Sequence, residues 1–177
     1  MKKKIIITGG LGYIGTELCK LYSGVSWHHK IIVIDNRFIS ERVNQLRKWN
    51  IEFIQGDILD KNIIKKYCED ADVVHHLAGI TDVPRTKSEA LTSQDEKIKE
   101  VGETGTQNIL DVINEKCKII FPSTHVVYEG IGEVKTNIKE DENTKPILSY
   151  STSKAINEKQ LKESGKNYII LRLGSVY

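Results

Sequence analysis

The chain has 177 residues, which suits one domain that buries roughly 70% of the surface of its unfolded chain. Its 26 Lys and Arg and 24 Asp and Glu residues are scattered without a basic stripe, so we expect no nucleic-acid partner. The apolar run after Lys4 is too short for an export signal, and nothing approaches the roughly 18 apolar residues of a membrane span. We therefore expect a cytoplasmic protein with no membrane partner.

A glycine-rich turn follows the first predicted strand, residues 4–8, and precedes a helix predicted over residues 13–22. A strand that turns sharply into a helix directs backbone N–H groups and the positive helix end at one point. Glycines at the spacing G-x-x-G-x-x-G would let a pyrophosphate approach that point, although the same spacing occurs in ordinary tight turns. The residues assigned to this phosphate cradle are Gly9, Gly12, Tyr13, Ile14 and Gly15.

An acidic residue ends the second predicted strand, residues 30–35. Asp35 lies about 20 residues after Gly15, the distance at which a carboxylate commonly binds the adenosine ribose hydroxyls of NAD. The carboxylate would repel the 2′-phosphate of NADP, but Arg37 could accommodate one. Alternatively, Asp35 caps the following turn. We predict NAD as the cofactor and add Asn36 to its site.

The remaining Ile- and Val-rich runs predict further strands, and amphipathic stretches between them predict helices. We expect each strand to be buried on both faces. Right-handed crossovers then give an α/β fold, a doubly wound parallel sheet with strand order 3-2-1-4-5-6. The further strands are 51–55, 72–77, 118–122 and 168–173, and the further helices are 40–49, 61–68, 88–115 with irregularity, and 149–163.

Two glycines interrupt the long predicted helix 88–115. Each of Gly102 and Gly105 should destabilise a helix by about 1 kcal/mol relative to alanine. Either another part of the chain approaches closely there or the helix breaks. The stretch 125–148 is the one long predicted loop, and loops of that length usually carry function.

A phenol and an ammonium lie four residues apart in the predicted helix 149–163. Tyr150 and Lys154 therefore share one helix face. A nearby cation favours the phenolate and should lower the pKa of Tyr150 from its usual value near 10, which would make it a usable base. Taken alone, Tyr-x-x-x-Lys is more often surface decoration.

The glycine run, Asp35, Tyr150 and Lys154 together resemble the extended short-chain dehydrogenase/reductases, and within them the NAD-dependent epimerase/dehydratase family of nucleotide-sugar enzymes. The resemblance implies one dinucleotide-binding Rossmann domain over residues 1–177 and a nucleotide-sugar substrate. Further matching segments are 56–58, 76–79, 105–110, 123–124, 127–128 and 172–177.

The resemblance also implies roles for individual residues. Asp57 and Ile58 would lie against the adenine, and Leu77, Ala78 and Gly79 would line the cofactor site.

Three side chains would carry the chemistry that the resemblance implies. Tyr150 would take a proton from a sugar hydroxyl while hydride passes to the nicotinamide. Lys154 would hold the phenolate and the nicotinamide ribose, and Thr124 would orient the reacting oxygen. In an epimerase similar to UDP-glucose 4-epimerase, the resulting ketone turns over and receives the same hydride on its other face.

Other activities stay open. The family's 4,6-dehydratases carry Asp-Glu after this Thr, whereas His125 and Val126 stand here, which disfavours dehydration and sugar-acid decarboxylation. An NAD(P)-dependent 4-keto-sugar or ketone reductase is one alternative, with His125 either a proton donor or structural. A non-catalytic NAD-binding module is another. Relatives often form homodimers through their fourth and fifth helices, so a homodimer is possible.

No metal site is expected. The pairs at 28–29 and 75–76 lack nearby ligands at a useful spacing, and we interpret these histidines as structural. Cys19, Cys68 and Cys117 lack a C-x-x-C pair and are expected to be buried apolar residues.

The chain also departs from the family pattern. Gly102 stands where an asparagine is common, and Glu129 interrupts a Val-Tyr-Gly segment, so the exit of that loop should differ. Family members continue past the segment matched at 172–177 into a smaller region that grips the nucleotide sugar. We therefore expect a fragment that holds the cofactor but interconverts UDP-glucose and UDP-galactose poorly.

Overall fold

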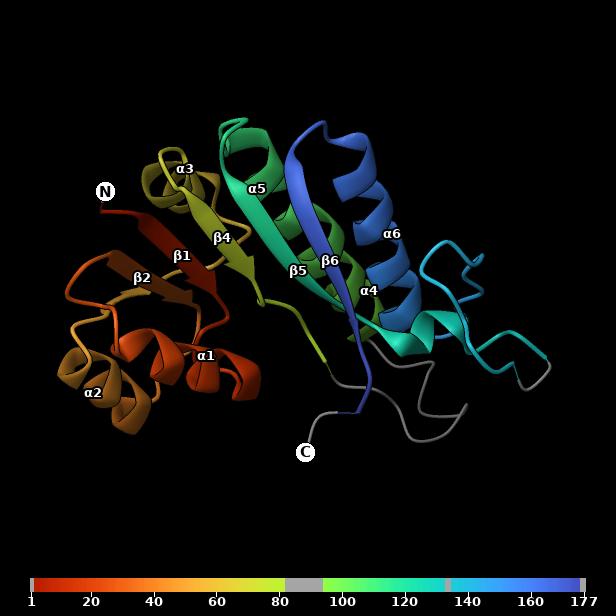
Figure 1. The fold of residues 1–177 in the computed structure, drawn as a ribbon, viewed down its shortest axis with the longest axis horizontal. Helices are drawn as coiled ribbons and strands as arrows, with labels where there is room; N and C mark the ends of the chain where they lie inside the picture. Colours follow the sequence, from red (N-terminus) through yellow and green to blue (C-terminus); the bar gives the residue numbers. More distant parts are fainter. Residues whose placement is uncertain (1, 82–93, 133–134, 176–177) are drawn as a thin grey trace.

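Six parallel strands form one sheet in the computed structural model, which describes residues 2–81, 94–132 and 135–175 (Figure 1). The strand order is β3-β2-β1-β4-β5-β6, which confirms the predicted doubly wound topology. The strands are β1 Lys4–Thr8, β2 Lys30–Asp35, β3 Glu52–Gln55, β4 Val73–His76, β5 Lys118–Thr124 and β6 Asn167–Leu173.

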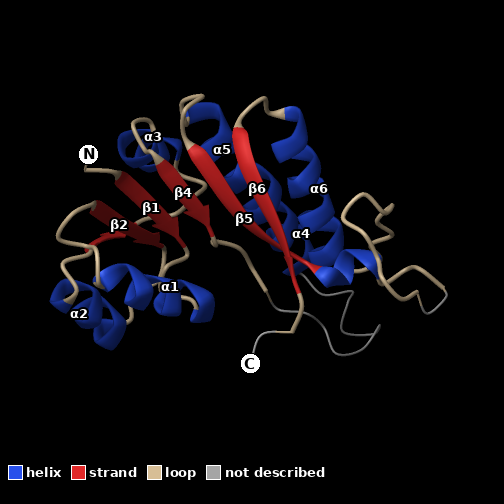
Figure 2. Cartoon of the chain, viewed as in Figure 1, coloured by secondary structure: helices blue, strands red, loops and turns tan. Residues whose placement is uncertain are grey.

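Helices cover the sheet in two layers. Helices α1 and α2 lie over one face, and α3, α5 and α6 lie over the other (Figure 2). None of the helices in the described ranges is both long and apolar enough to cross a membrane. The helical elements are α1 Tyr13–Ser23, α2 Ser40–Lys48, α3 Lys61–Cys68, α4 Gln94–Lys99, the π-helix η2 Glu100–Thr104, α5 Gly105–Val112, the 3₁₀-helix η3 His125–Tyr128 and α6 Ser149–Glu163.

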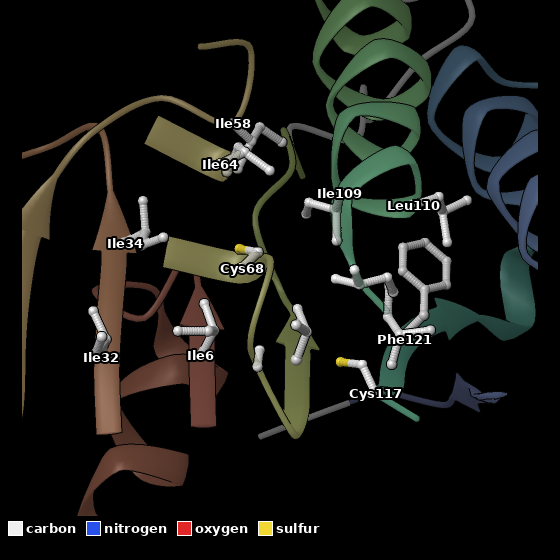
Figure 3. Close-up of a cluster of buried hydrophobic side chains, with 14 of the residues drawn as sticks. Ile6, Ile32, Ile34, Ile58, Ile64, Cys68, Ile109, Leu110, Cys117 and Phe121 are labelled. Atoms are coloured by element: carbon white, nitrogen blue, oxygen red, sulfur yellow. The ribbon is translucent and has the colours of Figure 1, made fainter. Parts of the chain in front are cut away.

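The alternation of side chains along the central strands divides the core between the two layers. Ile5 and Ile7 of β1 face the cluster under α1 and α2. Ile6, between them, faces the larger cluster under α3, α5 and α6 (Figure 3). All three cysteines are buried and free, as predicted.

The expectation that every strand is buried on both faces is wrong for β3 and β6. Both are edge strands that pair with one neighbour only. Ile169 and Leu171 of β6 retain 39% and 44% of their accessible surface. Runs of Ile and Leu therefore did not distinguish an edge position from a central one.

The long helix predicted over 88–115 lies partly outside the described residues, and the described part is interrupted by η2. A Cβ added to Gly102 would collide with Ser153 Oγ, and one added to Gly105 would collide with Ile58. The predicted close approach is confirmed at both glycines. The helix ends at Val112, three residues before the predicted end, because Ile113 is extended.

The turn from β1 into α1 depends on a left-handed backbone. Gly9 has φ +69°, and its N–H donates to Ile34 O at 2.8 Å. A Cβ there would lie 2.6 Å from Ala78 N, which is backbone and cannot yield easily. This position therefore requires glycine.

We predict that Gly9→Ala lowers the free energy of unfolding by about 2 kcal/mol or more, because it adds strain at positive φ to a backbone collision. Urea denaturation measures the change. The control is Gly24→Ala, where φ is −64° and the nearest atom lies 3.8 Å away. Equal stability changes in the two variants would contradict the requirement for glycine at position 9.

Candidate functional site

A cleft of about 990 Å³ opens at the carboxyl edge of the sheet. Parallel sheets bind ligands at this edge, where the connections from neighbouring strands diverge to opposite faces. Here β1 and β4 are those neighbours. Every residue assigned to the site from sequence lines this one cleft: Gly9, Gly12, Tyr13, Ile14, Gly15, Asp35, Asn36, Asp57, Ile58, Leu77, Ala78, Gly79, Thr124, Tyr150 and Lys154.

The glycine run forms a cradle at the start of α1. Gly12 is the N-cap residue, and no side chain caps this helix end. The first N–H groups of a helix have no intrahelical partner and attract anions. A Cβ on Gly12 would stand 3.1 Å from Gly9 O, so a side chain there would crowd the turn. These features fit a pyrophosphate lying against Tyr13–Gly15.

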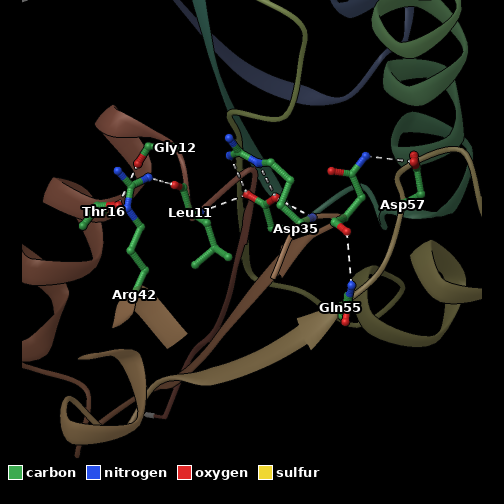
Figure 4. A network of polar contacts seen from close by, with 9 residues as sticks. Leu11, Gly12, Thr16, Asp35, Arg42, Gln55 and Asp57 are labelled. Carbon is green, nitrogen blue, oxygen red and sulfur yellow. Dashed lines mark hydrogen bonds and ion pairs between the residues drawn. The ribbon is translucent and has the colours of Figure 1, made fainter. Parts of the chain in front are cut away.

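Asp35 lies at the adenosine end of the predicted cofactor site and is only 5% exposed. Its Oδ2 accepts from Leu11 N at 3.0 Å, and its Oδ1 accepts from Arg37 N and Nε, each at 3.1 Å (Figure 4). Nearby, Asn36 Nδ2 donates to Asp57 Oδ2 at 3.0 Å. Asp35 therefore orders the turn as well as lining the cleft, so the capping interpretation also holds.

Lys154 is the buried cation of the cleft, with 9% of its surface exposed. Its Nζ donates to Pro122 O at 3.0 Å and lies 4.4 Å from the centroid of the Phe121 ring. Burial lowers the pKa of Lys154 to about 8. Lys154 therefore gives up its proton more readily than an exposed lysine.

Tyr150 does not have the lowered pKa that the spacing predicted. Burial raises the pKa of Tyr150 above its usual value. Lys154 Nζ lies 5.9 Å from the centroid of the Tyr150 ring and donates to Pro122 O instead. In this arrangement desolvation of the phenolate outweighs its attraction to the ammonium.

Thr124 ends β5 and begins η3, where its Oγ1 accepts from Val126 N at 3.2 Å. His125, the next residue, places Nδ1 3.1 Å from Leu173 O. His125 is exposed and is not among the residues that line the cleft. Its geometry supports the structural alternative over proton donation.

A buried ion pair lies behind Thr124. Glu158 of α6 accepts from Ser123 Oγ at 2.6 Å and from Arg172 Nη2 at 2.6 Å. Burial would raise the pKa of Glu158, but the hydrogen bonds from Arg172 and Ser123 hold it below its usual value. Arg172 also donates to Glu140 O at 2.9 Å. This network joins α6, β5, β6 and the loop after η3.

Glu129 binds the segment that leads from the loop after η3 into α6. Its Oε1 accepts from Ile147 N and Leu148 N, each at 2.7 Å, and from Ser151 Oγ. A carboxylate near a helix N-terminus also complements the helix dipole. Ile147 and Leu148 precede Ser149, the first residue of α6, so Glu129 fixes the chain at the entry to the helix that carries Tyr150.

His76 lies below the cleft and is fully hydrogen-bonded. Nδ1 is 2.9 Å from Thr8 Oγ1, and Nε2 is 3.0 Å from Thr106 Oγ1. Burial, with a contribution from the charge of Lys154, lowers the pKa of His76 to about 3. The neutral ring joins β1, β4 and α5, in agreement with its structural interpretation.

Sequence reasoning did not assign some cleft residues to the site. Ser123, Leu173 and Gly174 lie at the carboxyl ends of β5 and β6. The rule that ligands bind at these ends could have identified them. Arg42 and Lys97 reach the cleft from helices α2 and α4, and no motif marks either of them.

The buried charge of Lys154 should destabilise the folded chain by an amount that depends on pH. Its pKa is about 8 in the folded chain against 10.5 ordinarily, so the unfolded chain binds the proton more tightly, and stability should rise with pH between these values. We predict that Lys154→Met raises the free energy of unfolding at pH 7 by about 1–3 kcal/mol. The gain should shrink as pH rises through this range in denaturant titrations. Lys159→Met, at an exposed site, is the control. A gain independent of pH would show that burial of the charge is not its source.

Removal of the Glu129 carboxylate should also have a measurable effect on stability. We predict that Glu129→Ala lowers the free energy of unfolding by about 1–3 kcal/mol, because two backbone N–H groups lose their acceptor. Glu129→Gln keeps an acceptor oxygen and should lose less. Chemical denaturation of both variants tests this, and equal losses would argue against a stabilising role of the hydrogen bonds to the side-chain oxygen.

The sequence of the chain is similar to those of known proteins. Residues 5–177 match the family described as the NAD dependent epimerase/dehydratase family. The chain is 32% identical to a dTDP-D-glucose 4,6-dehydratase from Dictyostelium discoideum, over 99% of this chain and 44% of that protein. It is 30% identical to a UDP-glucose 4-epimerase from Neisseria meningitidis serogroup C, over 93% of this chain and 49% of that protein.

A solved structure extends the likeness to three dimensions. The UDP-glucuronic acid 4-epimerase from Bacillus cereus, in complex with NAD, aligns with a TM-score of 0.79 and 29% identity. The alignment covers 100% of this chain and 57% of that one. The chain thus spans about half the length of the relatives it matches. The description of this family names NAD, which is the cofactor predicted from Asp35 and the glycine run. The chain belongs to the NAD dependent epimerase/dehydratase family.

Proposed function

We propose that the chain is the cofactor-binding and catalytic part of an NAD-dependent nucleotide-sugar epimerase that resembles UDP-glucose 4-epimerase. The observation that carries this proposal is that Thr124, Tyr150 and Lys154 line the same cleft as the glycine cradle and Asp35. A module that only bound a dinucleotide would need the cradle and Asp35 alone. The relatives named as epimerases support the same assignment.

The residues of the cleft fit NAD from end to end. The helix end at Gly12 would hold the pyrophosphate, and Asp35 the adenosine ribose. Lys154 would bind the nicotinamide ribose. NAD bound there would supply a hydride acceptor beside the sugar carbon. Ala78 and Gly79, at the end of β4, leave this part of the cleft free of large side chains.

Tyr150 would transfer the proton. Its hydroxyl would take the proton of the sugar hydroxyl as hydride leaves the same carbon, which forms a ketone. It would return the proton when the hydride is delivered to the opposite face. Thr124 Oγ1 would hydrogen-bond the reacting oxygen. The raised pKa of Tyr150 means that substrate or cofactor must draw Lys154, or another positive charge, closer before the phenol can act as a base.

The residues that follow Thr124 favour epimerisation over dehydration. Dehydration needs a carboxylic acid and a carboxylate near the sugar, and His125 and Val126 follow Thr124 here. The carboxylate of Glu158 is buried and bound to Arg172 and Ser123. Although a 4,6-dehydratase is among the relatives, we therefore place this chain with the epimerases.

We predict that Tyr150→Phe lowers the rate of UDP-glucose and UDP-galactose interconversion by about 100-fold or more, since the variant lacks the general base. NAD affinity should stay the same. Chromatographic separation of the two sugar nucleotides, over incubations long enough for slow turnover, measures the rate. Tyr168→Phe removes a phenol from the edge strand and is the control.

Other outcomes separate the alternative functions. Stoichiometric consumption of NAD(P)H with a 4-keto sugar would identify a reductase. Tight NAD binding with no turnover, and with no effect of Tyr150→Phe on cellular function, would identify a binding module. Turnover that survives Tyr150→Phe at full rate would exclude this tyrosine as the base.

A further inference from the structure

Two residues of α6, about one helical turn apart, hold the end of β5. Lys154 Nζ donates to Pro122 O at 3.0 Å, and Ser123 Oγ donates to Glu158 Oε1 at 2.6 Å. Side chains at this spacing lie on the same face of a helix, one above the other. Consecutive residues of the strand are therefore bound to consecutive turns of the helix, and α6 cannot slide along β5 without breaking both contacts.

Glu158 also ties β5 to β6. Ser123 and Arg172 are direct neighbours across these two strands, and both of them bind Glu158. The guanidinium is bidentate, because Nε lies 2.9 Å from Oε1 and Nη2 lies 2.6 Å from Oε2. Paired, charge-assisted hydrogen bonds of this kind fix direction as well as distance. The carboxylate thus sets the position of α6 relative to both strands.

Arg172 extends the network to the loop between β5 and α6. Its Nη1 donates to Glu140 O at 2.9 Å and to the hydroxyl of Tyr128. The guanidinium carbon also lies 5.1 Å from the centroid of the Tyr128 ring. The Tyr128 hydroxyl in turn donates to Lys139 O at 3.2 Å. One guanidinium therefore anchors the loop that joins the strand and the helix of the candidate catalytic residues.

The network is buried and its members are hydrogen-bonded. Glu158 is 2% exposed and Ser123 is 3% exposed. In the part of the chain that the structure describes, no buried side-chain nitrogen or oxygen lacks a hydrogen-bond partner. A buried ion pair is weak evidence for stability, because apolar residues of similar size often stabilise a core as well or better. A fully hydrogen-bonded network does, however, enforce one arrangement of the groups around it.

We propose that Glu158 and Arg172 are positioning residues for the proton transfer. They hold Thr124 in register with Tyr150 and Lys154, although neither of them lines the cleft. The inference rests on the proposed epimerase function and extends it to residues behind the site. A misplacement of about 1 Å can slow a chemical step by about 100-fold. Loss of the network should therefore lower turnover without a matching loss of cofactor binding.

The test compares Glu158→Gln with the wild-type chain in the interconversion of UDP-glucose and UDP-galactose. The amide keeps the size of the side chain but loses the charge that binds Arg172. We expect kcat to fall by about tenfold or more, with KM and the dissociation constant of NAD changed by no more than about threefold. The control is Leu161→Ala, which opens a cavity in the core on the same helix. It should lower stability while kcat stays within about threefold of the wild-type value.

A second measurement needs no turnover. Val126 N donates to Thr124 Oγ1 at 3.2 Å, so amide hydrogen exchange at Val126, followed by NMR, reports the position of Thr124. Relative to the amides of β1, Val126 should lose about tenfold more protection in Glu158→Gln than in Leu161→Ala. Ser123→Ala removes one hydrogen bond to Glu158 and leaves its ion pair, so it should show the same loss if Glu158→Gln does not fold.

The possible outcomes separate this inference from the proposed function. A fall in kcat in Glu158→Gln no larger than in Leu161→Ala would overturn the inference, and so would unchanged protection of Val126 in both network variants. A wild-type chain that binds NAD without turnover would overturn the proposed epimerase function. Exchange at Val126 would still decide whether the network positions Thr124.

Discussion

The pairing of β1 with β4 is the constraint on which the rest of the molecule depends. The two strands lie side by side, with Thr8 opposite His76, yet the chain leaves them toward opposite faces of the sheet. That divergence opens the cleft. The neutral ring of His76 fixes the junction from below, because it bonds Thr8 on one side and Thr106 on the other. A buried polar joint therefore lies beneath the cleft.

Charge is concentrated around this cleft at the expense of stability. Asp35, Lys154 and Glu158 are each at most 9% exposed. Burying a charge is unfavourable unless partners replace water, and each of the three has different partners. Asp35 has N–H donors and Arg37, and Glu158 has Arg172 and Ser123. Lys154 has one carbonyl and an aromatic face, which replace its hydration only in part, and burial lowers its pKa to about 8.

Much of the fold, and the residues assigned to the cleft, could be predicted because both follow from local sequence rules. Ile- and Val-rich runs located the six strands, and the glycine spacing located the cradle. What the sequence did not reveal depends on tertiary contacts. The direction of the Tyr150 pKa shift depends on whether Lys154 Nζ donates to a carbonyl or to the phenol. The chemical roles of the site residues remain predictions, and so does the homodimer. Neither a chemical role nor a dimer can be inferred from where a side chain lies within a single chain.

The edge strand β6 has one strand partner and two half-exposed apolar residues, Ile169 and Leu171. The salt bridge from Arg172 to Glu158 fastens its carboxyl end, whereas its amino end begins at exposed residues. Amide hydrogen exchange should therefore be graded along this strand, fastest near Asn167 and slowest near Arg172. Opening would then start at the end far from the cleft, and the strand could fray without disturbing Thr124 and Ser123.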